Sequence, residues 1–156
     1  MAKISLGKAV PNFTGMISND SIFDLSDYKG QNIVIYFYPK DSTPGCTKEG
    51  EDFRDSFESF KKNNAVIMGV SRDSVSSHEK FSNKYNFPFK LISDEDEKVC
   101  KLFDVIKEKN MYGRKYMGIE RSTFLIDQKG ILVNEWRKVR VKGHVEEVLE
   151  ALINCN

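Results

Sequence analysis

Residues 36–49 read Tyr36-Phe37-Tyr38-Pro39-Lys40-Asp41-Ser42-Thr43-Pro44-Gly45-Cys46-Thr47-Lys48-Glu49. The run from Ile33 to Tyr38 is β-branched and aromatic, which predicts a central strand covered on both faces. A turn rich in Pro and Gly follows and ends on Cys46, where an amphipathic helix is predicted to start and to run to about Lys62. Unpaired N–H groups and the dipole at a helix N-terminus favour the thiolate, which is the nucleophilic form of cysteine.

The neighbours of Cys46 fit a reactive thiol. The Thr43 hydroxyl can both donate to and accept from a group bound at the sulfur, and Gly45 lets a ligand approach the backbone closely. Pro39 and Pro44 stiffen the loop. The alternative interpretation is that Cys46 is a small buried hydrophobe, which is the commoner fate of an isolated cysteine.

Pro39, Thr43 and Cys46 match the Pro-x-x-x-Thr-x-x-Cys signature of the peroxiredoxins, which are thiol peroxidases on a thioredoxin-like fold. The fuller run 37–47 resembles the bacterioferritin comigratory protein (peroxiredoxin Q) subfamily. The similarity continues in order through 11–13, 53–55, 69–71, 91–94, 117–119, 121–127 and 143–144. The resemblance implies an α/β, three-layer sandwich with a central mixed sheet flanked by helices, as a single domain over residues 1–156.

The composition is ordinary for a soluble globular protein. At 156 residues the chain is long enough for one domain with a real core, and its formal net charge of +1 indicates neither nucleic acid nor membrane as a partner. The three cysteines, at 46, 100 and 155, are too few and too far apart for a disulfide framework, which favours the reducing cytoplasm. The N-terminal residues 1–8 contain no apolar leader, and no run is long enough to span a membrane.

The remaining pattern also predicts an α/β sandwich with a mixed sheet, because strands alternate with helices before a terminal hairpin. Expected strands lie in a hairpin at 14–25 and at 65–71, 91–92, 122–126 and 131–136. Expected helices run from a Ser74 cap to about Tyr85, from a Ser93 cap through an acidic first turn, and from Gly143 to Ile153. The polar, basic segment from Asp104 to Ile119 is predicted to be a loop.

The expected chemistry centres on Cys46, which would attack one peroxide oxygen and become a sulfenic acid. Thr43 and the Cys46 backbone N–H would hold the peroxide, and Pro39 would shield the sulfur. The resemblance gives Arg121 the role of the cation that stabilises the thiolate and the moving negative charge, and Glu49 the role of its hydrogen-bond partner. From the residues alone, a solvated strand end is the favoured interpretation of Arg121. The alternative interpretation of Glu49 is an acid in the first turn of a helix, which the helix dipole favours.

The sequence departs from the subfamily at the second, resolving cysteine. The usual position five residues after Cys46 holds Glu51, and the alternative position on the next long helix, near residues 81–84, holds no cysteine. Cys100 has apolar neighbours and is interpreted as structural, whereas Cys155 lies at the C-terminus and could form a mixed or intersubunit disulfide. The main prediction is a one-cysteine mechanism in which an external thiol (thioredoxin, glutaredoxin or glutathione) reduces the sulfenic acid. The resemblance favours a monomer, with a dimer as the alternative.

No cofactor or metal is expected. His78 and His144 are scattered and lack cysteine neighbours, and His144 is interpreted as an exposed residue at a helix start. The basic segment 136–142 carries no nucleic-acid motif and is interpreted as a solvated strand end. Two other functions compete with the peroxidase: a thiol–disulfide relay, which the lack of Cys-x-x-Cys disfavours, and a non-catalytic holdase, which the missing resolving cysteine slightly favours.

Overall fold

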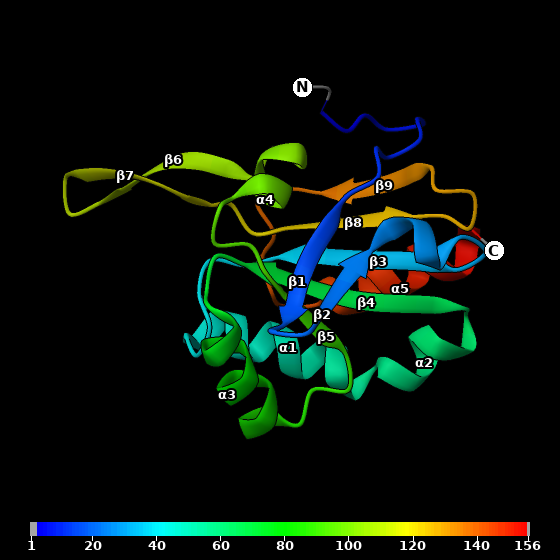
Figure 1. Cartoon of the computed structure of the whole chain (residues 1–156), viewed down its shortest axis with the longest axis horizontal. Helices are drawn as coiled ribbons and strands as arrows, with labels where there is room; N and C mark the ends of the chain where they lie inside the picture. The colour runs from blue at the N-terminus through cyan, green and yellow to red at the C-terminus, as the bar shows by residue number, and fades with distance from the viewer. Residues whose placement is uncertain (1–2, 156) are drawn as a thin grey trace.

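Strand β3 (Asn32–Phe37) runs through the middle of a seven-stranded sheet in the computed structural model, which describes residues 3–155 (Figure 1). All of its residues are buried, because both faces of the strand are covered. It pairs in parallel with β4 (Ala65–Ser71) and antiparallel with β8 (Ser122–Ile126). The predicted central strand and the mixed character of the sheet are therefore confirmed.

The sheet order is β2-β1-β5-β4-β3-β8-β9, so both predicted hairpins lie at its edges. The remaining strands of the sheet are β1 (Thr14–Ser18), β2 (Ser21–Asp24), β5 (Lys90–Ser93) and β9 (Leu132–Trp136). Among the helices that the structure describes, none combines the length and apolarity needed to cross a lipid bilayer. Predictions about the N-terminal segment that concern Met1 and Ala2 lie outside the described residues.

Alternate side chains of β3 enter two separate hydrophobic clusters, one on each face of the sheet. The cluster that contains Tyr36 and Cys46 is covered by α1 (Pro44–Asp55), α2 (Phe57–Lys62), α3 (Val75–Tyr85) and α5 (His144–Cys155). The cluster that contains Phe37 and Cys100 is covered by α4 (Lys98–Leu102) and the 3-10 helix η1 (Leu25–Tyr28). The expected arrangement of a sheet between helices is present (Figure 1).

Two helix predictions need correction. The helix expected from Cys46 to Lys62 begins earlier, at Pro44, and is broken at Ser56 into α1 and α2. The short helix expected to be capped by Ser93 begins only at Lys98. Its first N–H groups are satisfied by a more distant acid, because the Asp94 carboxylate accepts from the backbone of Val99 and Cys100.

The loop predicted from Asp104 to Ile119 is wrong, because most of it forms a two-stranded hairpin of β6 (Ile106–Met111) and β7 (Arg114–Ile119). Its two turn residues, Tyr112 and Gly113, both have positive φ, which is the backbone of a tight hairpin turn. The hairpin projects from the body of the molecule (Figure 1) and exposes both faces over much of its length. Without a buried face there is no alternation of apolar and polar residues to indicate strands.

Candidate active site

Cys46 lies in the first turn of α1, directly after the loop that leaves β3. Thr43 is the N-cap residue of this helix and Pro44 its first residue, a position where the fixed φ of proline suits a helix start. Cys46 therefore lies at a helix N-terminus, as predicted. The Cys46 residue is only 1% exposed, so its sulfur is nearly closed off from solvent.

Arg121 bridges Cys46 and Glu49. Its Nη2 donates to the Cys46 Sγ over 3.4 Å, and its Nη1 donates to Glu49 Oε1 over 2.7 Å. Gly45 makes room for this contact, because a Cβ at that position would lie 3.1 Å from Nη2. Three side chains that the sequence singled out separately thus form one connected group, with a positive charge beside the sulfur and a negative charge behind it.

The Glu49 side chain is fully buried, and burial raises the pKa of its carboxyl to about 7 even though the Arg121 charge opposes the shift. Its Oε2 has no hydrogen-bond partner among residues 3–155, and neither has the buried hydroxyl of Tyr36. The carboxyl therefore has one oxygen that a proton can occupy while the other still accepts from Arg121.

Thr43 and Pro39 belong to the loop between β3 and α1, and both are partly buried. The Thr43 hydroxyl donates to the backbone oxygen of Lys40 over 2.8 Å, and it makes no cap hydrogen bond to the helix. Because its proton is committed to Lys40, the Thr43 oxygen faces its surroundings as an acceptor.

Comparison with known proteins agrees with this geometry. A model described as the AhpC/TSA family matches residues 6–135. This chain belongs to the AhpC/TSA family. Its relatives include the peroxiredoxin Bcp of Bacillus subtilis, 54% identical over 149 residues and covering 96% of this chain and 95% of that protein. The peroxiredoxin Bcp of Xanthomonas campestris is 59% identical over 128 residues, covering 82% of this chain and 80% of that protein.

The solved structures show the same relationship. The bacterioferritin comigratory protein of Xanthomonas campestris superposes with a TM-score of 0.91 at 51% identity, covering 99% of this chain and 97% of that one. A peroxidoxin BcpB from Mycobacterium tuberculosis superposes with a TM-score of 0.85 at 28% identity, covering 98% of this chain and 99% of that one. This peroxiredoxin is therefore a thiol-dependent peroxidase on a thioredoxin-like fold.

The other two cysteines of this peroxiredoxin lie away from Cys46. Cys100 is fully buried in the cluster on the opposite face of the sheet, and burial raises the pKa of its thiol well above the ordinary value. Its interpretation as a structural thiol agrees with these surroundings. Cys155 is exposed at the end of α5, and all three thiols are free.

His144 corrects another prediction. It begins α5 as expected, but it is buried, with Nε2 2.7 Å from the Thr123 hydroxyl and its ring edge-on to Trp136. Burial, together with the Arg121 charge, lowers the pKa of its imidazole to about 4. Its position at a helix start gave no sign of burial, because the strand that covers it comes from elsewhere in the chain.

Lys109 of β6 was not singled out by its sequence. Its side chain lies against Gly118, where a Cβ would be 3.2 Å from the Lys109 Cδ. Burial and the Arg121 charge lower the pKa of its ammonium group, and the Cys46 sulfur opposes that shift. The hairpin thus brings a second cation into electrostatic reach of Arg121 and Cys46. The sequence could have placed Lys109 near this site only if the β6–β7 hairpin had been predicted.

Glu49 makes the stability of this peroxiredoxin depend on pH. A carboxyl whose pKa is about 7 when folded and 4.5 when unfolded stabilises the fold fully below 4.5, and this stabilisation is lost as the pH rises to 7. Glu49→Gln removes the titration. The free energy of unfolding of this variant, relative to wild type, should rise by on the order of 3 kcal/mol across that window. Urea unfolding at a series of pH values measures the difference.

His144 supplies the matched control for this measurement, because its pKa is lowered and its effect has the opposite sign. A folded pKa of about 4 against 6.5 means that its stabilisation is present above 6.5 and is lost as the pH falls to 4. The stability of His144→Gln relative to wild type should therefore fall as the pH rises across its window. A difference between Glu49→Gln and wild type that stays constant with pH would show that the Glu49 carboxyl is not perturbed.

Proposed function

We propose that Cys46 is the peroxidatic cysteine and that its thiolate attacks one oxygen of a peroxide. An S–O bond forms as the O–O bond breaks, and the sulfur becomes a sulfenic acid. The leaving oxygen takes a proton and departs as water or an alcohol. In this proposal Arg121 stabilises both the thiolate and the negative charge that moves across the oxygens.

One observation carries this assignment: the guanidinium of Arg121 donates to the Cys46 sulfur while Glu49 holds its other nitrogen. Arg121 is thereby fixed with one N–H directed at the sulfur before any substrate arrives. A preorganised donor of this kind acts where charge develops and needs no reorganisation during the reaction. Thr43 and the Cys46 N–H would bind the peroxide, with Pro39 shielding the sulfur and Glu49 acting through Arg121.

The proposed substrates are hydrogen peroxide and small organic hydroperoxides. The similar Xanthomonas campestris protein was solved as a trapped intermediate and ligand complex in a study of alkyl peroxide reduction. That likeness supports including organic hydroperoxides. The near-complete burial of Cys46 favours small peroxides over bulky ones.

We further propose a one-cysteine cycle in which an external thiol such as thioredoxin, glutaredoxin or glutathione reduces the sulfenic acid. The thiol attacks sulfur and releases water, and a second thiol then frees Cys46 from the mixed disulfide. Supporting this, Glu51 occupies the usual resolving position and Cys100 lies on the other face of the sheet. We propose a cytoplasmic location, because three free thiols suit a reducing compartment. We also propose that the chain forms a single domain and acts as a monomer.

Intact mass after one equivalent of hydrogen peroxide tests the proposal. Wild type should gain one oxygen, and a sulfenic-acid trap should form an adduct on Cys46. Cys46→Ser should give neither product and should lose peroxidase activity, whereas Cys100→Ser and Cys155→Ser should behave as wild type. A wild-type chain in which Cys46 stays unmodified would falsify the assignment. A rapid disulfide between Cys46 and either other cysteine would replace the one-cysteine cycle.

The two competing functions predict different results in the same preparation. A thiol–disulfide relay would reduce a protein disulfide, such as that of insulin, in the absence of peroxide. A non-catalytic holdase would suppress aggregation of a client protein equally well in wild type and Cys46→Ser. Peroxide turnover that depends on Cys46, without disulfide reductase activity, leaves the peroxidase as the function.

A further inference from the structure

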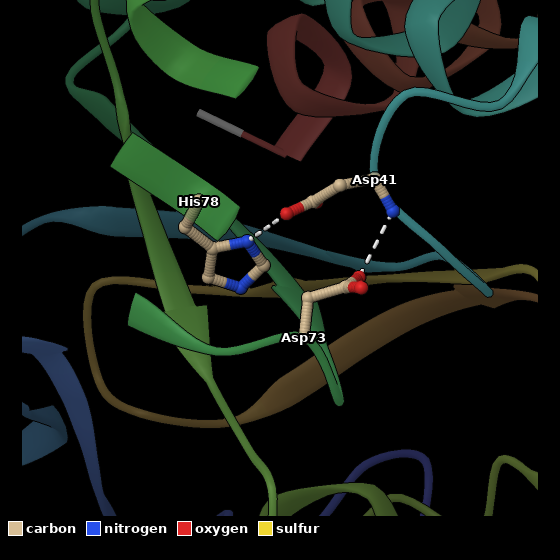
Figure 2. A group of neighbouring side chains, drawn as sticks. All are labelled: Asp41, Asp73 and His78. Carbon is tan, nitrogen blue, oxygen red and sulfur yellow. Dashed lines mark hydrogen bonds and ion pairs between the residues drawn. The ribbon is translucent and has the colours of Figure 1, made fainter. Parts of the chain in front are cut away.

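We infer that Asp41 and His78 form a buried, hydrogen-bonded pair that positions the loop before Cys46 for its reaction with peroxide. The inference rests on the proposed role of Cys46. Figure 2 shows the Asp41 carboxylate pointing at the imidazole of His78, with Asp73 below it. Asp41 comes from the loop between β3 and α1, His78 from α3 and Asp73 from the turn between β4 and α3.

Asp41 is tied to two other segments and to Tyr38 of its own loop, and its side chain is nearly fully buried. Its Oδ2 accepts from Ser77 Oγ over 2.8 Å and lies 2.7 Å from His78 Nδ1, while its Oδ1 accepts from the Tyr38 hydroxyl over 2.7 Å. Its backbone N–H donates to Asp73 Oδ2 over 2.9 Å. A loop residue with four such contacts is held by its surroundings.

Both ring nitrogens of His78 have a close polar partner. Nδ1 faces the Asp41 carboxylate, and Nε2 lies 3.0 Å from the backbone oxygen of Ile92, so both partners are acceptors. Each nitrogen also has a hydroxyl 3.5 Å away, but the Tyr38 and Ser71 hydroxyls already donate to carboxylates. Both ring nitrogens of His78 therefore have hydrogen-bond partners, and the contact between Nδ1 and the Asp41 carboxyl is a short, buried hydrogen bond.

The backbone conformation of the loop explains why it needs the contacts of Asp41. Ser42, which follows Asp41, has a φ of 63°, in the left-handed region that residues other than Gly, Asn and Asp rarely adopt. A conformation of this kind persists only when the surrounding structure fixes it. Thr43 comes next, donates to Lys40 and starts the helix that carries Cys46. Releasing Asp41 would therefore let both Thr43 and the first turn of α1 move.

The same three side chains could be considered a metal site, because Asp41, Asp73 and His78 each offer a ligand atom within 4.8 Å of the others. The contacts argue against that use. The Asp41 oxygens and Asp73 Oδ2 already accept hydrogen bonds, and both ring nitrogens of His78 already have partners. The hydrogen bonds of the group are satisfied without a metal, which suits a structural support for the loop.

Asp41→Asn and His78→Gln test the inference. Both remove the contact between carboxyl and imidazole but keep amide groups that can hydrogen-bond, and the second variant serves if the first does not fold. At a temperature where each variant is folded, the rate constant for Cys46 oxidation by hydrogen peroxide should fall at least about tenfold, because small misplacements of reacting groups are costly. Alkylation of Cys46 by iodoacetamide needs no peroxide site and should fall less, or increase.

The ratio of the two rate constants separates positioning from general stability. Asp94→Asn is the matched control, since Asp94 is also a buried acid but caps α4 instead of the active-site loop. It should lower the melting temperature and leave the ratio unchanged. A ratio in folded Asp41→Asn or His78→Gln equal to that of wild type overturns the inference. If wild-type Cys46 is not oxidised at all, the proposed function fails, and the inference fails with it.

Discussion

Arg121→Gln should slow the oxidation of Cys46 by hydrogen peroxide by roughly 10²–10³-fold, the usual cost of removing one preorganised donor from a charged transition state. The guanidinium is the side-chain donor that the structure directs at the Cys46 sulfur. Glutamine keeps some polarity but supplies neither the positive charge nor N–H donors on two different nitrogens, which Arg121 uses for Glu49 and Cys46. Quenched-flow mass spectrometry of the sulfenic acid gives the rate constant directly.

Above pH 7, where the Glu49 carboxyl is ionised in the wild type, the same substitution should also destabilise the fold, because it leaves this buried carboxyl without its cation. Breaking a buried ion pair by removing one partner typically costs about 3–5 kcal/mol. At low pH the carboxyl of Glu49 takes up a proton and the loss should shrink. Adding Glu49→Gln should restore much of the stability but none of the rate, so that the two effects separate.

Arg137→Gln is the control for both measurements. Arg137 is a half-buried arginine that also donates to neighbouring backbone and to Glu135, but it does not contact Cys46. Its loss should leave the oxidation rate at the wild-type value. An Arg121→Gln enzyme that reacts with peroxide as fast as wild type would remove Arg121 from the mechanism.

Glu51→Cys should convert the enzyme to a two-cysteine mechanism. After one equivalent of peroxide the introduced thiol should condense with the Cys46 sulfenic acid, with loss of water, and the chain should carry a disulfide. Two residues five apart in a helix have Cα atoms about 8–9 Å apart and point to different sides. A disulfide needs Cα atoms within about 7 Å, so the first turns of α1 must unwind.

Mass spectrometry without reductant should therefore show a chain two hydrogen atoms lighter than its reduced form, and circular dichroism should show a loss of helix. Asp55→Cys is the matched control, because it lies on the same helix but too far along it for partial unwinding to reach Cys46. It should leave the sulfenic acid intact. Should the Glu51→Cys chain keep both a sulfenic acid and a free thiol, α1 does not open after oxidation.

Much of the fold could be predicted because most of its helices and strands have a clear local sequence pattern. The buried run before Cys46, the Ser74 cap and the apolar face of α5 each carry a pattern that only one structure satisfies. The β6–β7 hairpin could not be predicted in this way. It makes little contact with the core, so its strands are held by their mutual hydrogen bonds and a tight turn, and not by an apolar face.

The candidate site divides along a similar line. Cys46, Thr43 and Glu49 lie within one strand–turn–helix, where spacing alone places them together. Arg121 needed the family resemblance, since nothing in its own surroundings in the sequence indicates that it meets a sulfur. The Asp41–His78 pair lay outside both kinds of reasoning. Asp41 lies in the loop after β3 and His78 in α3, and these segments come together only because β3 and β4 are neighbours in the sheet. In the sequence, each residue alone is typical of a solvated loop or helix.

The burial of Cys46 has a kinetic consequence for the recycling half of the cycle. An attacking thiol must approach the sulfur in line, and the closed first turn of α1 leaves almost no surface for it. In the proposed one-cysteine cycle, we therefore expect reduction to proceed from a minor, opened population of the oxidised enzyme. As the reductant concentration increases, the turnover rate should saturate at the rate of that opening. Chemically different thiols should therefore give the same maximum turnover rate.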